Sequence, residues 1–420
     1  MALSSVPREE DGMRRRNLKG AFAMLWSLTF ITCSQPGTPP SGKSTSTHVY
    51  ISGEVGSSTN GILPVYWKDG VINYLQLSPP YTNGYAFGIA VDTAGTVYVQ
   101  GGQFVGNTST IIYGYWKGST FTALTLPYAN TAMAETGIAV DTSGNVWLAY
   151  TVGSSSPPTI PAYWLNSGYP NSLPNATNVI SVGADTSGNV YFLGTTGGAS
   201  SNATPYNNNW TPTVWKNGTS ASALPLTGAN IYGVPHSLAL DASGSVYVCG
   251  QQWSAIIGMP VYWKEIGGIW GNPTPMNEGA YSSSIQWWGP AVGIAVDGAG
   301  TVDCMETIAG TTPSNTNRYY SSSGTLAATL ICWKGISNAP TAVALLSGYT
   351  YWYTWYNGGV DAGGDYIVAG ALANSSAEAS NDTGIPVYWK NEGNPFQLPL
   401  GSNSGAANTY GKAFSVAVGP

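Results

Sequence analysis

The stretch GIAVDTAGTVYVQG at residues 88–101 decides the fold, because it recurs along the chain. Self-similarity at a fixed period is the signature of a repeat architecture. Five further copies follow it: GIAVDTSGNVWLAY (137–150), SVGADTSGNVYFLG (181–194), SLALDASGSVYVCG (237–250), GIAVDGAGTVDCME (293–306) and the decayed GGVDAGGDYIVAG (358–370).

A second block, built around a tryptophan, alternates with the first, and PVYWKDG at 64–70 is an example. A Leu-rich stretch follows each of these blocks, and an insertion around residues 307–329 lengthens the sixth unit. The position of the tryptophan is fixed relative to a hydrophobic strand, so we interpret it as packing between units. The seven repeated tryptophans are Trp67, Trp116, Trp164, Trp215, Trp263, Trp333 and Trp389.

Each unit is predicted to form four short antiparallel strands. GIAV is an apolar strand, and D-x-x-G is a tight turn in which Asp accepts backbone N–H groups and Gly supplies a positive φ. V-Y-V alternates as a strand does, P-V-Y-W is the third strand, and K-N-G or K-D-G turns the chain into the Leu-rich outer strand. Four strands in 40–50 residues is the period of a propeller blade, so seven units predict an all-β, seven-bladed β-propeller.

The two ends of the repeat region favour a closed ring. The first unit begins at THVYISG (47–53) and lacks its GIAVD strand, whereas the chain ends with such a strand, AFSVAVGP (413–420). We expect the strand from Phe414 to Val418 to complete the blade that begins at Val49, which protects the sheet edges. An open solenoid is the structural alternative, but it would need capping units instead.

The phrase G-I-A-V-D-x-x-G-N-V-Y/W resembles the bacterial β-propeller repeat family and is similar to the NHL-type repeat. The Trp block Y-W-K-N-G looks like that of propeller lipoproteins from spirochaetes and related bacteria. This resemblance covers residues 48–420 and implies a single propeller domain. It implies no particular activity, because propellers host unrelated functions.

Residues 1–32 are predicted to be a signal peptide, with RRRNLK at 14–19 ahead of an apolar core at 21–32. Met13 is the more natural start, because three acidic residues lie before it. Cys33 follows the core at once and resembles the lipidated residue of a bacterial lipoprotein. Ordinary cleavage with an incidental Cys33 is the alternative. The Pro/Gly/Ser/Thr-rich segment 33–47 is then a flexible tether.

The composition suggests an exported protein with few charges. Only 8% of the residues are charged, against 43% hydrophobic. Beyond residue 32 the chain has nine Lys and Arg and seventeen Asp and Glu, a net charge of −8. Nucleic-acid binding relies on clustered Lys and Arg, so we expect no nucleic-acid partner. We expect a monomer at the outer membrane, cell surface or periplasm, held to the membrane through its lipid anchor only.

Two polar residues recur with the repeat, and we interpret both as structural. An Asp that caps its own turn is favoured over a ring of cation ligands, and a solvated hairpin Lys is favoured over a basic ring for an anionic ligand. The third unit has Leu165 in place of the Lys. The repeated residues are Asp92, Asp141, Asp185, Asp241, Asp297 and Asp361, with Lys68, Lys117, Lys216, Lys264, Lys334 and Lys390.

Aromatic residues outside the repeat are the candidate binding residues. They concentrate in YSSSIQWW (281–288), in YTYWYTWY (349–356) and near the loops of the fifth unit. We expect loops on one face of the ring to carry them, where exposed rings stack on sugars or anchor a protein. Packing over the core is the alternative. The candidates are Trp253, Trp270, Trp287, Trp288, Tyr351, Trp352 and Trp355.

The sequence contains no catalytic constellation that we recognise. His48 and His236 are the two histidines, and neither G-x-S-x-G nor H-E-x-x-H occurs. We therefore expect no catalytic residue, metal or cofactor. Cys304 and Cys332 fall in adjacent strands, so a disulfide between them is open. Non-repeat acids could still serve a glycosidase as a pair; they include Asp303, Glu306, Asp365 and Asp382.

Two functional hypotheses follow. The first is a non-enzymatic surface or periplasmic lipoprotein that binds a protein or a glycan with aromatic loops of the fifth to seventh units. The second is a polysaccharide-acting enzyme, a lyase or a glycosidase, with carboxylates near the axis. Two inward carboxylates about 5–10 Å apart in an open cleft would favour the enzyme.

Overall fold

The computed structural model describes most of the region from residue 47 to the C-terminus, and every regular element in it is a β-strand. The described part contains no helix of the length and hydropathy needed to cross a membrane. The described ranges are 47–57, 61–105, 110–126, 132–153, 160–197, 210–228, 232–253, 258–276, 288–308, 329–335, 341–343, 346–347, 351–361, 364–374, 383–391, 393–403 and 405–420.

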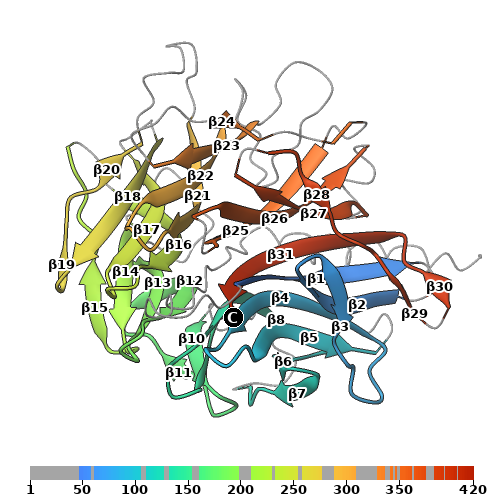
Figure 1. The fold of residues 1–420 in the computed structure, drawn as a ribbon. Helices are drawn as coiled ribbons and strands as arrows, with labels where there is room; N and C mark the ends of the chain where they lie inside the picture. Colours follow the sequence, from blue (N-terminus) through green and yellow to red (C-terminus); the bar gives the residue numbers. More distant parts are fainter. Residues whose placement is uncertain are drawn as a thin grey trace, which may run out of the picture.

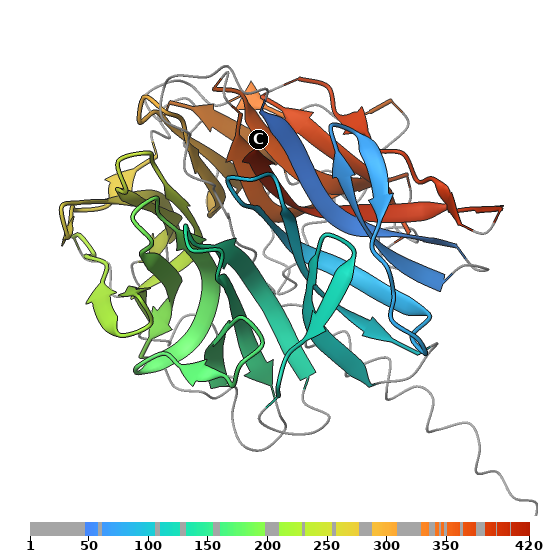
Figure 2. The same cartoon turned by 60° about the horizontal axis from the view of Figure 1, so that its bottom comes forward.

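Seven small antiparallel sheets stand around one axis, each a blade with long inner strands and a short outer strand (Figures 1 and 2). The seven-bladed β-propeller predicted from the repeat is therefore confirmed. The fifth blade carries an extra short strand, β20, beside β18. A separate two-stranded hairpin, β29 with β30, leads into the last strand of the chain.

The strands follow the repeat blade by blade. The first blade has β31 (Tyr410–Gly419), β1 (His48–Ser57), β2 (Gly61–Lys68) and β3 (Val71–Tyr74), and the second has β4 (Asn83–Val91), β5 (Val97–Phe104), β6 (Ile111–Lys117) and β7 (Thr120–Ala123). The third has β8 (Ala132–Val140), β9 (Val146–Gly153), β10 (Ile160–Leu165) and β11 (Asn171–Ser172), and the fourth has β12 (Ala176–Ala184), β13 (Val190–Thr196), β14 (Thr211–Lys216) and β15 (Ser220–Ala223).

The remaining strands complete the ring. The fifth blade has β16 (Tyr232–Leu240), β17 (Val246–Trp253), β18 (Gly258–Ile266), β19 (Ile269–Trp270) and β20 (Thr274–Pro275), and the sixth has β21 (Trp288–Val296), β22 (Val302–Ile308), β23 (Thr329–Lys334) and β24 (Thr341–Ala342). The seventh has β25 (Tyr351–Val360), β26 (Tyr366–Ala373), β27 (Ile385–Lys390) and β28 (Phe396–Gln397), and the extra hairpin is β29 (Ser402–Asn403) with β30 (Ala406–Ala407).

The ring closes in the first blade, where the two ends of the repeat region pair. β31 lies antiparallel to β1, with Val49 opposite Val418 and Ile51 opposite Val416. The predicted closure is therefore confirmed, and an open solenoid is excluded. A buried ion pair lies in the same seam: Lys412 Nζ is 3.2 Å from Glu54 Oε1, and both side chains are about 5% exposed. Such a pair fixes the register, because any other register would leave a charge buried alone.

The repeated D-x-x-G turn has the geometry that its sequence predicts. In the second blade Asp92 Oδ1 accepts the backbone N–H groups of Ala94 at 2.9 Å and of Thr96 at 2.8 Å. Gly95 has a φ of 80°, which other residues rarely adopt. The same Oδ1 contacts occur at Asp141, Asp185, Asp241 and Asp297.

Each repeated tryptophan is buried between its own blade and the blade before it. All seven are at most 1% exposed. Trp215 Nε1 donates to the carbonyl of Pro174 in the third blade at 3.0 Å, and Trp67 Nε1 donates across the closure to Pro399 at 2.9 Å. The indoles of Trp116, Trp164 and Trp263 make the equivalent bond. Blades are therefore joined by packing and by one repeated hydrogen bond.

The two ends of each blade differ, and both faces of the disc can be named. Tyr98 near the start of β5 lies opposite Lys117 at the end of β6, so the Asp turn and the third-to-fourth-strand hairpin share one end. Every blade repeats this order, and we call this end the turn face. The opposite end, where loops join the second strand to the third and one blade to the next, is the loop face.

The ion pair in the seam gives a test of closure. Lys412→Met leaves Glu54 buried without its charge partner, so we expect the free energy of unfolding to fall by about 3–5 kcal/mol. Lys216→Met, at an exposed lysine, should cost under about 1 kcal/mol. Urea denaturation of both variants measures this. Equal effects of the two substitutions would contradict a role for the pair in closing the ring.

Candidate functional site

The turn face carries one polar trio that repeats from blade to blade. In the second blade Lys117 Nζ lies 5.3 Å from the ring centroid of Tyr98, and the Tyr98 hydroxyl donates to Asp92 Oδ2 at 3.2 Å. The fourth and fifth blades repeat both contacts through Tyr191 and Tyr247. The lysines and turn aspartates of these blades therefore bind their own tyrosines.

The third blade shows why one lysine is missing. Trp147 replaces the tyrosine, and its Nε1 donates to Asp141 Oδ2 at 2.9 Å. Leu165 is the residue opposite Trp147 on the neighbouring strand, where the other blades place lysine. The Asp141 carboxylate loses solvent by burial, but hydrogen bonds from Trp147 and Asn145 outweigh that cost and lower its pKa.

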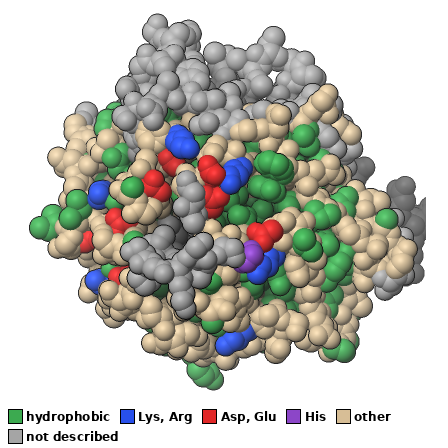
Figure 3. Space-filling view, in the orientation of Figure 1, with side chains coloured by type: hydrophobic (Ala, Val, Ile, Leu, Met, Phe, Trp, Pro, Cys, Tyr) green, Lys and Arg blue, Asp and Glu red, His purple; other side chains and the backbone are tan. Residues whose placement is uncertain are grey.

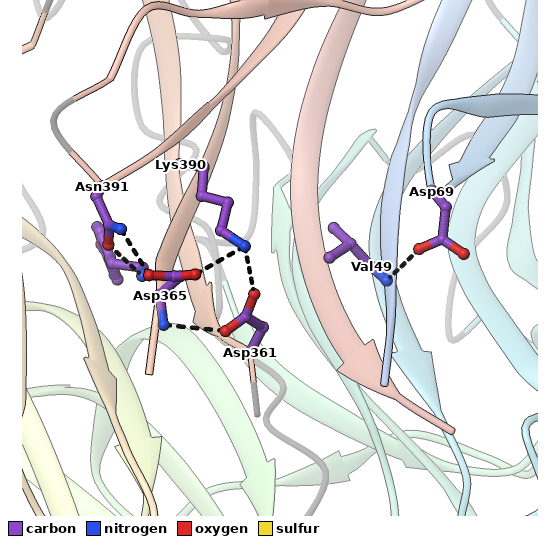
Figure 4. A network of polar contacts seen from close by, with 7 residues as sticks. Val49, Asp69, Asp361, Asp365, Lys390 and Asn391 are labelled. Carbon is purple, nitrogen blue, oxygen red and sulfur yellow. Dashed lines mark hydrogen bonds and ion pairs between the residues drawn. The ribbon is translucent and has the colours of Figure 1, made fainter. Parts of the chain in front are cut away.

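The seventh blade turns the trio into an ionic network (Figure 4). Lys390 Nζ lies 2.9 Å from Asp361 Oδ2 and 2.7 Å from Asp365 Oδ2. The side chain of Asn391 donates to Asp365 Oδ1 at 2.7 Å. The hydrogen bond from Lys390, followed by that from Asn391, lowers the pKa of Asp365, and both carboxylates raise the pKa of Lys390. A single lysine therefore bridges two carboxyl groups.

The sixth blade departs most from the repeat. Glu306 is fully buried at a position where most other blades have glycine, and its Oε2 accepts Trp333 Nε1 at 2.9 Å. Trp333 thus bonds within its blade. Asp303, also buried, stands in the place of the repeated tyrosine and accepts the Gly335 backbone N–H at 2.8 Å. Asp382, the remaining acid considered from the sequence, lies outside the described residues.

One candidate aromatic residue lies on the loop face in an ordered stack. Trp253 ends β17 and is partly exposed, and its ring stacks on that of Tyr232 with centroids 5.9 Å apart and planes 8° apart. Its Nε1 donates to Gln251 Oε1 at 2.8 Å. Gly258 leaves room for the indole, because a Cβ there would lie 2.7 Å from an indole carbon. Hydrogen bond and stack together fix the orientation of the indole. The repeat pattern does not predict Tyr232 or Gln251 as its partners.

The other described candidate aromatics lie in strands, and one of them, Trp270, lies at the opposite face. Trp270 lies in β19, at the turn-face hairpin of the fifth blade, and packs against the core from its edge. Tyr351, Trp352 and Trp355 belong to the inner strand β25. The expectation that all of them stand in loops of one face was therefore wrong.

The physical reason is strand length. β26 continues to Ala373, and pairing with it draws Tyr351 and Trp352 into the sheet as partners of Ala373 and Leu372. Trp288 likewise begins β21, opposite Ile308. Trp287 lies outside the described residues, as does Cys33 with the whole segment 1–46.

The cysteines of the sixth blade do not form the disulfide that the sequence left open. Cys304 lies opposite Trp333, whereas Cys332 lies opposite Met305, so the two are one register position apart. They also belong to different hydrophobic clusters, on opposite sides of the blade. Cys249, Cys304 and Cys332 are buried and belong to no disulfide, and burial raises the pKa of Cys304 well above its usual range.

His236 is buried in the inner strand of the fifth blade, at the position of a β-bulge. Bulges recur at the same level in the other inner strands, where the buried residues include Phe87, Ile180 and Phe414. Burial lowers the pKa of His236 to about 3. The imidazole is therefore neutral at physiological pH and belongs to the packed interior. Within the described residues no group of three His, Cys, Asp or Glu side chains could hold a metal ion.

Comparison with known proteins identifies no family for this chain. No protein-family model matches the chain, and no curated protein matches it. Among solved structures, a polysaccharide lyase (an ulvan lyase) is similar with 11% identity and a TM-score of 0.46, over 88% of this chain and 94% of that one. A xyloglucanase from Xanthomonas campestris has 13% identity and a TM-score of 0.45, over 78% and 54% of the two chains. A protein of unknown function from Bacteroides caccae has 10% identity and a TM-score of 0.35, over 89% and 99%.

The hydrogen bond between blades can be tested at Trp215. Trp215→Phe keeps most of the ring packing but removes the donor to Pro174, so we expect unfolding to become easier by about 1–3 kcal/mol. Trp270→Phe is the matched control, because that indole packs only at the edge. Urea denaturation compares the two. If Trp215→Phe lowers the free energy of unfolding no more than Trp270→Phe does, the hydrogen bond between blades does not stabilise the fold.

Buried His236 predicts acid sensitivity of the fold. Its folded-state pKa lies below the usual 6.5, so the unfolded chain binds the proton more tightly. Stability is full above about pH 6.5 and falls as the pH drops toward 3, by about 2–3 kcal/mol at pH 4.5. His236→Ile should remove this part of the pH dependence, and His48→Ala should retain it. Unchanged dependence in His236→Ile would refute the assignment.

Proposed function

We propose that the protein is an exported, lipid-anchored propeller that binds a glycan or protein partner through its loop face. The proposal rests on how the two faces differ. In the second, fourth, fifth and seventh blades the repeated lysine and aspartate of the turn face hold a tyrosine or each other, so their regularity has a structural cause. The loop face instead carries side chains that do not recur in the repeat.

The observation that carries the proposal is the Trp253–Tyr232 stack. An indole held by a ring beneath it and by Gln251 at its Nε1 is preorganised, so little rotamer freedom is lost when a ligand contacts it. Partly exposed tryptophan is the residue type that stacks on sugar rings or anchors a protein interface. The stack stands at the end of β17, beside the loops of the fifth blade.

The described carboxylates support binding over polysaccharide cleavage. A glycosidase needs one protonated carboxyl and one carboxylate. Asp361 and Asp365 form a close pair, but Lys390 bridges them and the pKa of Asp365 is lowered. Glu306 is fully buried against Trp333. The lysine-bridged pair and the buried Glu306 do not supply the exposed acid that such a reaction needs, so a polysaccharide-acting enzyme is the less supported alternative.

Export and anchoring are proposed from the sequence at Cys33. Palmitate labelling of cells that make the full chain tests the anchor, with Cys33→Ala as the control. Incorporation that depends on Cys33 supports lipidation. Incorporation that survives Cys33→Ala, or none at all, contradicts it.

Ligand binding can be tested on a glycan array with the full chain. We expect Trp253→Ala to reduce binding at least tenfold by removing the stacking surface. Trp270→Ala, which removes an indole from the other face, should leave binding unchanged. If no glycan binds, the glycan form of the proposal is lost; equal losses in both variants would contradict a role for the loop face.

A further inference from the structure

Large apolar side chains are exposed at one recurring place in the fold. Of the eight exposed large hydrophobic residues in the described part, six lie in or beside the hairpins that join third and fourth strands. Single exposed hydrophobic residues are normal on a protein surface, but these six share one structural position in the blades. The six are Val71 at 65% exposed, Leu165 at 36%, Tyr169 at 77%, Ile266 at 62%, Ile269 at 75% and Phe396 at 50%.

The fifth-blade hairpin shows the feature most clearly. Ile266 and Ile269 lie opposite each other across the turn at Gly267 and Gly268. Both glycines have positive φ, 62° and 86°, which is the backbone of a tight two-residue hairpin. Two isoleucines therefore stand side by side at a tip. They contribute nothing to the core from there.

All of these hairpins project from the turn face, near its margin. The first, third, fifth and seventh blades supply them, so they are spread around the ring. Charged side chains lie around the middle of the view and toward its left edge, and hydrophobic side chains cover a larger area to the right of the middle (Figure 3). We call these six side chains the apolar tips. A flat surface touches separated tips at once, whereas a protein partner needs a continuous patch of about 800 Å².

The chain enters the propeller on this same face. The backbone N–H of Val49 donates to Asp69 Oδ1 in the first-blade hairpin at 2.9 Å (Figure 4), and the backbone N–H of Asp69 donates to the carbonyl of Val49 at 2.8 Å. The segment 33–47 joins the described part there, and even fully extended it reaches at most about 50 Å. A lipid on Cys33 therefore holds the point where the chain enters the propeller, on the turn face, within about 50 Å of the bilayer.

The charge of the turn face selects the kind of lipid. Six lysines lie on it, but the turn aspartates with Asp69, Asp365 and Glu265 outnumber them. Four of the lysines lie over tyrosine rings and one bridges two aspartates. Such a face attracts no anionic headgroups. Its attraction to a membrane comes from apolar burial alone.

We propose that the turn face rests on a zwitterionic phospholipid surface, with the apolar tips in the headgroup region and the loop face directed away from the bilayer. This proposal rests on the anchored function above and adds an orientation to it. The Trp253–Tyr232 stack then faces outward, where a partner can reach it.

Paired cysteine labels test the orientation in the full chain. Ile269→Cys places an environment-sensitive fluorophore at a tip, and Val105→Cys places it at the end of β5 on the loop face, at an apolar residue 38% exposed. The three described cysteines are buried, and the unsubstituted chain serves as the labelling blank. Each labelled chain is mixed with excess phosphatidylcholine vesicles, with and without brominated acyl chains.

We expect brominated lipid to quench the probe at position 269 at least threefold more than the probe at 105. Adding Tyr169→Ser and Phe396→Ser should reduce the quenching at 269 severalfold, because the tips act together. Replacing a third of the lipid with phosphatidylglycerol should not increase the quenching of the probe at position 269.

If brominated lipid does not quench the probe at position 269, the proposal is overturned, and the apolar tips would then be assigned to a protein partner. Stronger quenching at 105 overturns the orientation, and quenching that requires phosphatidylglycerol overturns the apolar basis. Palmitate labelling reports the anchor separately, and excess vesicles bring the tips to lipid without it. Failure of the anchor and failure of the tips are therefore distinguishable.

Discussion

The bond from an indole N–H of one blade to a carbonyl of the blade before it is the contact on which the ring depends. Trp215 reaches Pro174 in this way, and Trp67 reaches Pro399 across the closure. A blade removed from its neighbours would expose a large ring and a donor together. Where this bond forms, the indole of a blade is satisfied only by the blade before it, and the indole of the first blade is satisfied by the last. This dependence explains why the tryptophan keeps its place while the loops vary.

The polar contacts also differ between the two faces: those of the turn face repeat from blade to blade, and those of the loop face do not. On the turn face, aspartate, tyrosine and lysine satisfy one another within each blade. Where the tyrosine is replaced, as by Asp303 or Trp147, the partner changes with it. On the loop face, Trp253 is held by residues outside the repeat, Tyr232 and Gln251. Recognition can vary there without disturbing the contacts between blades.

The repeat was enough to predict the blades, their number and the closure, since period and turn chemistry are local properties of the sequence. It did not predict how far an inner strand extends, so Tyr351 and Trp352 were expected in a loop. It also did not show which face a hairpin occupies, so Trp270 was misplaced. Glu306 could have been noticed, because it occupies a position that is glycine in most units. The bond to Trp333 depends on side-chain geometry that no periodicity contains.

The pairing of β31 with β1 also determines the order in which the chain can complete its fold. Its partners lie at opposite ends of the propeller sequence, so the longest loop in the chain must close before this pairing forms. Until β31 has left the ribosome, β1 has an unpaired edge, and unpaired edges favour association with other chains. A protein with this closure depends on a chaperone, or on rapid completion of synthesis, between the folding of its first blade and the pairing of its last strand.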